Sequence, residues 1–181
     1  MQELHPSGQN RDRLKESVAG LLVIHSAPNA LRPHIEWGLQ SILGTWLTLQ
    51  WRDQPCAPGT YRTTVEFRDV RGSAAKIASA LRGWHYLRFE VREESELGGE
   101  FYRSTPELGI HRASIDGLGN IVVTEHQITE ALAKGFDDLS IRDAIDEILG
   151  NQWERELAPF REVEIDQIIT PGDLKDRCRY T

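Results

Sequence analysis

Two segments of the sequence place basic, hydroxyl and imidazole side chains next to the predicted start of a helix. The first contains His25, Ser26, Arg32 and His34, and the second contains Arg71, Gly72, Ser73 and Lys76. Free backbone N–H groups at a helix N-terminus, with cationic side chains nearby, favour bound anions such as phosphate or carboxylate. The two segments therefore predict a binding site for a small anionic ligand. The competing interpretation is structural, with the polar residues acting as helix caps and the arginines solvated.

A second hypothesis for the first segment is catalysis of the hydrolase or transferase type, with His25 or His34 as acid or base beside Ser26. Ser26 does not lie in a Gly-x-Ser-x-Gly elbow. The only acidic residue nearby is Glu36, which points away from His34 on the predicted helix. We therefore assign no catalytic residue and favour a non-enzymatic protein, leaving enzymatic activity open.

The histidines and cysteines do not predict a metal or a redox centre. The six histidines form no His-x-His pair and no His-Glu-x-x-His helix. Cys56 and Cys178 lie far apart in the sequence, which indicates neither a disulfide framework nor a thiolate metal site. No metal and no cofactor are expected.

Hydrophobic periodicity predicts the elements that must position these side chains. Residues 20–25 are apolar on both sides, which is typical of a strand buried on both faces. Alternation predicts further strands at 47–51, 61–68 and 87–92, and helical spacing predicts helices at 31–43 and from Ser73, as its cap, to Leu81.

This order, β-α-β-β-α-β, predicts an α+β protein with a ferredoxin-like core over residues 20–93. Its expected strand order is 4-1-3-2, with both helices on one face. We expect the first and third strands to run parallel, which would bring the two polar segments to the same edge of the sheet. The other face needs a cover over the first strand, either the C-terminal part of the chain or another subunit.

The remaining residues divide into an extension and two polar ends. Short apolar runs predict three strands, a capping box of Thr124 and Gln127 predicts the start of one helix, and Ser140 is expected to cap another, which together give an extension over residues 100–160. The predicted domain covers residues 19–160, between a flexible leader (1–18) and a polar tail (161–181).

Charge and hydropathy exclude some classes of partner. The net charge is −7, and residues 116–181 hold fifteen acidic but only seven basic side chains. Because neutralisation of phosphates by Lys and Arg supplies most nucleic-acid affinity, such binding is disfavoured. No apolar run is long enough for a membrane helix, and the N-terminus has no signal-peptide core, so a cytoplasmic protein is expected.

Several blocks of the sequence resemble an actinobacterial family, the domain-of-unknown-function family 3145. These blocks are His25–Trp37, Pro58–Arg62, Gly72–Trp84, Leu87–Val91, Leu108–Ile110 and Leu157–Phe160. The resemblance implies an actinobacterial cytoplasmic protein, and it implies no activity, cofactor or catalytic residue. The first function hypothesis is thus a small-ligand-binding or regulatory module whose partner is a small anion or a protein, with a homodimer as a further alternative.

Overall fold

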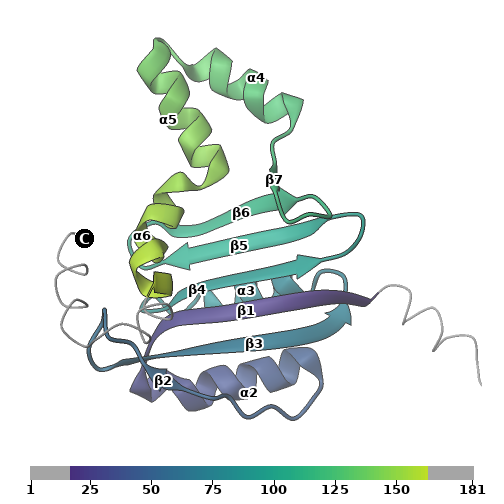
Figure 1. The fold of residues 1–181 in the computed structure, drawn as a ribbon, viewed down its shortest axis with the longest axis vertical. Coiled ribbons are helices and arrows are strands. Elements are labelled where there is room, and N and C mark those ends of the chain that lie inside the picture. The colour runs from purple at the N-terminus through teal and green to yellow at the C-terminus, as the bar shows by residue number, and fades with distance from the viewer. Residues whose placement is uncertain (1–16, 163–181) are drawn as a thin grey trace, which may run out of the picture.

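The computed structural model describes residues 17–162, which form a seven-stranded sheet flanked by helices (Figure 1). The sheet order is β2-β3-β1-β4-β5-β6-β7, and every neighbouring pair is antiparallel. The strands are β1 (Ser17–Pro28), β2 (Arg52–Asp53), β3 (Thr60–Val70), β4 (Arg88–Glu94), β5 (Gly99–Thr105), β6 (Gly109–Ile115) and β7 (Ile121–Val122). The helices are η1 (Asn29–Leu31), α2 (Arg32–Leu43), α3 (Ser73–Leu81), α4 (Glu125–Lys134), α5 (Asp138–Leu149) and α6 (Asn151–Glu162).

Most predicted elements are confirmed, because the hydrophobic pattern matches the face that each element buries. In β3, Val65 and Phe67 are buried on one side while Glu66 and Arg68 are exposed on the other. The strand predicted at 47–51 is wrong. This segment has no regular structure, and only Arg52 and Asp53 pair with β3.

The neighbour order β4-β1-β3-β2 agrees with the expected order 4-1-3-2. The expected direction of the third strand is wrong, since β1 and β3 run antiparallel, with Ser17 opposite Val70 and Pro28 opposite Thr60. The physical reason is the tight connection between β2 and β3, which reverses the chain direction before β3 begins. The parallel strands are β3 and β4, which flank β1.

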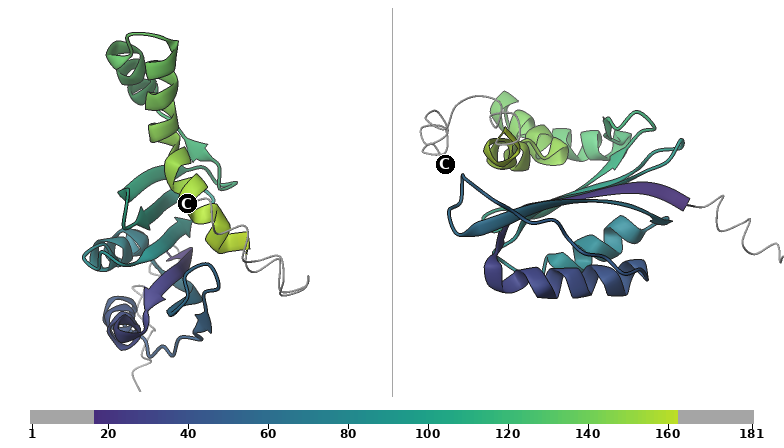
Figure 2. Two further views of the ribbon diagram at one scale, coloured as in Figure 1. Left: turned by 90° about the vertical axis from the view of Figure 1, so that its left-hand side faces the viewer. Right: turned by 60° about the horizontal axis from the view of Figure 1, so that its bottom comes forward.

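The two faces of the sheet are covered to different extents. Helices α2 and α3 pack on one face, where Leu22, Ile35, Ile77 and Phe89 belong to the buried core (Figure 2). On the opposite face, here called the outer face, α6 lies over one end of the strands and contacts β1 and β5. Within residues 17–162, the C-terminal part of the chain thus supplies a partial cover of this face.

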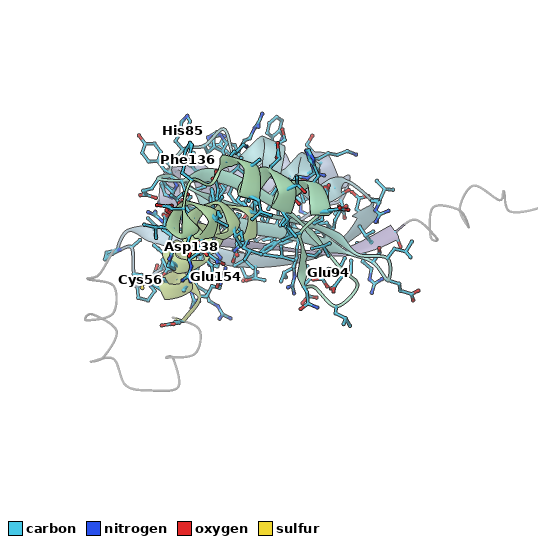
Figure 3. The ribbon with its side chains drawn as sticks, turned by 90° about the horizontal axis from the view of Figure 1, so that it is seen from above. Cys56, His85, Glu94, Phe136, Asp138 and Glu154 are labelled. Atoms are coloured by element: carbon cyan, nitrogen blue, oxygen red, sulfur yellow. The ribbon has the colours of Figure 1, made fainter. Side chains whose placement is uncertain are left out.

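Helices α4 and α5 form an arm that projects beyond β6 and β7, away from the sheet (Figure 1). Thr124 and Gln127 form the predicted capping box of α4. The cap of α5 is Asp137 rather than the predicted Ser140. Ser140 is the third residue of the helix, and its side chain hydrogen-bonds the backbone of Asp137 to complete the capping box. Phe136 and Asp138 lie at the connection between the two helices (Figure 3), and Phe136 is fully exposed.

The predicted boundaries of the domain need two changes. Ser17 and Val18 belong to β1 and not to the leader, and α6 extends past residue 160 to Glu162. The rest of the predicted leader and tail lies outside the described residues.

Cys56 is disulfide-bonded. The prediction that the cysteines form no disulfide is therefore wrong. None of the helices within residues 17–162 has the length and apolar character needed to cross a bilayer.

Candidate functional site

The two segments predicted to share one anion site lie at opposite ends of the sheet. His25 and Ser26 are near the C-terminal end of β1, which pairs with the beginning of β3, whereas Arg71 follows the end of β3. At about 3.4 Å per residue, the length of β3 separates the segments by roughly 30 Å. The prediction of one site at a common edge is therefore wrong, because it depended on parallel strands.

At the second segment, the chain's own carboxylates occupy the N-terminus of α3. Glu93, almost fully buried, accepts hydrogen bonds from the backbone N–H of Gly72 at 2.8 Å and of Ala74 at 3.0 Å. Ser73 does not cap the helix, since its hydroxyl donates to Asp69 at 2.6 Å and the cap position is Gly72. Because a carboxylate already fills the position that an anion would take, this terminus is a structural contact.

Arg71 and Lys76 lie exposed near this helix start.

At the first segment, the structure separates the residues of the catalytic hypothesis. His34 is exposed on α2. The Ser26 hydroxyl donates to the Thr60 hydroxyl at 3.2 Å, and the Arg32 guanidinium lies over the Tyr61 ring at 4.5 Å. These contacts hold Ser26 of β1 and Arg32 of α2 against β3, and neither contact joins Ser26 to the imidazole of His25 or His34.

His25 is the predicted site residue that enters a polar cluster on the outer face. Its Nε2 lies 2.7 Å from Oε2 of Glu90 on β4, and both side chains are buried. Arg161 of α6 donates to both oxygens of Glu90 and also to Glu154. Since an ionised carboxylate only accepts hydrogen bonds, Nε2 of His25 is the donor. We call His25, Glu90 and Arg161 the buried triad after its two buried members, His25 and Glu90, whereas Arg161 is half-buried.

The contacts in the buried triad explain the ionisation of Glu90. Burial by itself would raise the pKa of this carboxyl, but hydrogen bonds from His25 and Arg161 outweigh burial and lower the pKa from 4.5 to about 2. The same contacts with Glu90 and Glu154 raise the pKa of Arg161 despite the burial of its guanidinium. Glu90 therefore carries its negative charge at neutral pH.

The buried triad borders a pocket of about 520 Å³ on the outer face. Its other polar lining includes Arg52, Arg62, Gln50 and Thr64. Arg52 and Arg62 stand directly opposite each other in the β2–β3 ladder. Like charges at such a position repel each other, so an anion placed between them is stabilised. We call this the outer-face pocket.

Glu90 and Arg161 were missed as site residues. The alternation in β4 places Glu90 correctly on the side opposite Phe89 and Val91, where a solvated glutamate is the ordinary expectation. Its partners are 65 and 71 residues away in the sequence. No local signal identifies such a contact, although the predicted need for a cover over β1 pointed to this face.

The fold and the pocket define an α+β protein whose antiparallel sheet carries a cationic pocket beside a buried histidine–carboxylate–arginine cluster. The chain belongs to the family described as a protein of unknown function, DUF3145, whose profile matches residues 21–170. No curated protein and no solved structure was found to match the chain.

Among the described residues, no three His, Cys, Asp or Glu side chains come together in a way that would hold a metal ion.

Proposed function

We propose that the protein is a binding module for a small anion, such as a carboxylate or phosphate, and that the ligand occupies the outer-face pocket. This keeps the class of function expected from the sequence and moves the site from the two helix termini to the sheet. His25 is the predicted residue common to both positions. We also propose that the core formed by β1 to β4 with α2 and α3 is ferredoxin-like, on the basis of its strand order.

The observation that supports this proposal best is the cross-strand pair of Arg52 and Arg62 at a pocket of about 520 Å³. That volume is in the range of sites for small molecules. Among the described residues that line the pocket, Glu90 is the one acidic side chain, and it is already bound to Arg161 and His25. An incoming anion therefore meets the exposed Arg52 of β2 without displacing the buried triad.

Catalysis is a weaker alternative. The Ser26 hydroxyl donates to Thr60 and His34 is exposed on α2, so neither forms a catalytic pair with His25. What favours it is the buried contact between His25 and Glu90, since a carboxylate can orient an imidazole for proton transfer. Actinobacterial origin, a cytoplasmic location, a protein partner and a homodimer remain predictions.

Isothermal titration calorimetry with inorganic phosphate and acetate tests the binding proposal. Arg52 is exposed, so Arg52→Ala should leave the fold intact while weakening binding roughly tenfold or more, as expected for loss of a charge-assisted hydrogen bond. Arg68→Ala is the matched control, because Arg68 is exposed on the outer face of β3 but does not line this pocket. Equal effects of both substitutions, or no saturable binding of either anion, would contradict the proposal.

A further inference from the structure

The arm of α4 and α5 has almost no core of its own. Within residues 17–162, Ala131 is the one buried residue of α4, and α5 has none. The two helices pack near their connection, where Ile141 fills the space beside Gly135. A helix is stabilised by burying its apolar stripe against another element, and two short helices that project from a sheet leave much of that stripe in water. The arm therefore presents apolar surface that its own packing does not use (Figures 1 and 2).

This apolar surface runs along α4 and continues past its end. Ile128 and Leu132 are four residues apart, which places them on one face of α4, and Phe136 follows at the same spacing just after the helix. Ile128 is 44%, Leu132 56% and Phe136 100% exposed, and Leu139 at the start of α5 is 67% exposed. We call these four residues the apolar row. Single exposed apolar side chains are ordinary, but a row of them is typical of an interaction surface.

The arm also carries most of the net negative charge of the protein. Residues 125–149 hold seven acidic and two basic side chains, whereas the net charge of the whole chain is −7. Asp138 and Asp143 on α5 are exposed. Surfaces of opposite charge attract each other, and like charges brought together at an interface are costly. A second copy of the arm would bring the same negative charge, so the charge of the arm favours a basic partner over self-association.

We infer that the arm docks a basic amphipathic helix of another protein. The apolar face of that helix lies on the apolar row, and its Lys and Arg side chains face the carboxylates of α4 and α5. A third helix gives the arm the core that two helices lack, in the manner of an amphipathic helix bound in a groove. The surface is separate from the outer-face pocket, and the inference does not rest on the proposed anion site.

Three labelled peptides test this inference by fluorescence anisotropy with the full chain. The first peptide has about 18 residues of Leu and Lys, with Leu at helical spacing. The second has Glu at every Lys position, and the third has the composition of the first with Leu and Lys alternating, which removes the apolar helical face. The first peptide should bind saturably, and more weakly at raised salt. The Glu peptide should not bind, and the alternating peptide should bind roughly tenfold more weakly or not at all.

Substitutions with matched controls locate the binding surface. Phe136→Ser should weaken binding of the first peptide roughly tenfold, because an exposed aromatic side chain no longer becomes buried. Asp143→Asn should weaken it about threefold at low salt, as for an ion pair near the surface. Leu97→Ser and Glu96→Gln are the controls, since both residues are exposed in the β4–β5 turn, away from the arm. Thermal melts followed by circular dichroism show that each variant is folded.

Several results would overturn the inference. One is no saturable binding of the first peptide, and another is an equal effect of the arm substitutions and their controls. Binding of the Glu peptide as tight as that of the Lys peptide would remove the role of charge. Light scattering adds a fourth test, because a dimer of the full chain that Phe136→Ser dissociates would make a second copy the occupant of the apolar row. None of these results bears on binding of phosphate or acetate, so the anion site is tested independently.

Discussion

Glu90 links parts of the chain that are remote in sequence, since His25 lies on β1 and Arg161 on α6. A buried carboxylate is costly unless it is paired and hydrogen-bonded, and here three donor atoms from these two residues satisfy it. The same contacts fix the position of α6 on the outer face. One residue therefore determines both a wall of the pocket and the attachment of the helix.

The first prediction concerns Glu90 and pH. Because its pKa is about 2 in the folded protein, below the usual 4.5, folding is favoured wherever the carboxyl stays ionised. This contribution is present above about pH 4.5 and is lost as the pH falls toward about 2. It amounts to something on the order of 3 kcal/mol. Urea unfolding between pH 7 and pH 2.5 tests this contribution. Glu90→Gln should be less stable than the unmodified protein at neutral pH, and its free energy of unfolding should fall less as the pH is lowered.

Glu94→Gln is the control for this experiment. Glu94 lies on the same strand but is more exposed and pairs with Arg92 at 3.0 Å. Exposed ion pairs contribute little, so this variant should keep the stability and the acid profile of the unmodified protein within about 1 kcal/mol. An acid profile of Glu90→Gln that matches the unmodified protein would contradict the assigned role of Glu90.

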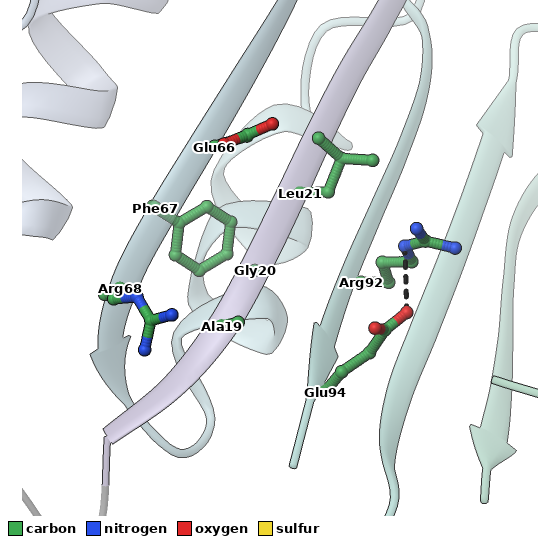
Figure 4. Close-up of a pocket in the computed structure, with 8 residues that line it drawn as sticks. All are labelled: Ala19, Gly20, Leu21, Glu66, Phe67, Arg68, Arg92 and Glu94. Atoms are coloured by element: carbon green, nitrogen blue, oxygen red, sulfur yellow. Dashed lines mark ion pairs between the residues drawn. The ribbon is translucent and has the colours of Figure 1, made fainter. Parts of the chain in front are cut away.

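At the scale of elements, β1 is an interior strand of the sheet, between β3 and β4, and it depends on a close approach between Gly20 and Phe67. The two residues pair across β1 and β3 (Figure 4). A Cβ atom at position 20 would lie 2.1 Å from the Phe67 ring, so the ring occupies the space that any side chain would need. The aromatic ring thus fills the gap that glycine leaves in the strand.

Gly20→Ala should therefore destabilise the protein by about 2 kcal/mol, because the buried Phe67 ring must move. Urea unfolding at neutral pH measures this loss. In Gly38→Ala the new methyl has only an ordinary contact, with Trp84 at 3.8 Å, and alanine favours the helix, so stability should stay equal or rise by up to about 1 kcal/mol. If Gly20→Ala and Gly38→Ala have the same stability, the packing argument for Gly20 is wrong.

Local signals identified most of the elements but not the pairing of every segment. Thr124 and Gln127 predicted the start of α4 because a capping box is formed within four consecutive residues. Alternating Leu47 and Leu49 predicted a strand that does not form. Leu47 and Leu49 pack against the hydrophobic core without a ladder, and the period of the side chains does not reveal that difference.

At the scale of the whole molecule, the arm of α4 and α5 is attached to the sheet through its C-terminal end. The buried guanidinium of Arg103 on β5 donates to the carbonyls of Leu149 at 2.8 Å and Gly150 at 3.1 Å. His111 on β6 contacts the carbonyl of Ile148 at 3.0 Å. A cation at a helix C-terminus also interacts favourably with the helix dipole. The direction of the arm is therefore set by residues of the sheet.

Arg103→Gln should loosen this attachment. Hydrogen exchange of the backbone amides in α5 should become at least roughly tenfold faster, because one or two hydrogen bonds to a charged donor are lost. Amides of β1 and β3, on the far side of the sheet, should change much less. Arg112→Gln is the control, since Arg112 on β6 is exposed and pairs with Glu100. Uniform acceleration throughout the sheet and the arm would contradict a local role for Arg103.

The sequence by itself determined the class of fold, the position of most elements and which side of β3 faces the core. These properties follow from periodicity, caps and turns within a few residues. Only the tertiary structure decided that β1 and β3 run antiparallel, that Glu93 fills the N-terminus of α3, and that Glu90 joins His25 and Arg161. Each of these depends on contacts between distant residues, whose partners are chosen by strand direction and by the packing of α6. The predicted anion site therefore moved from the helix termini to the outer face, with His25 as the residue that both interpretations share.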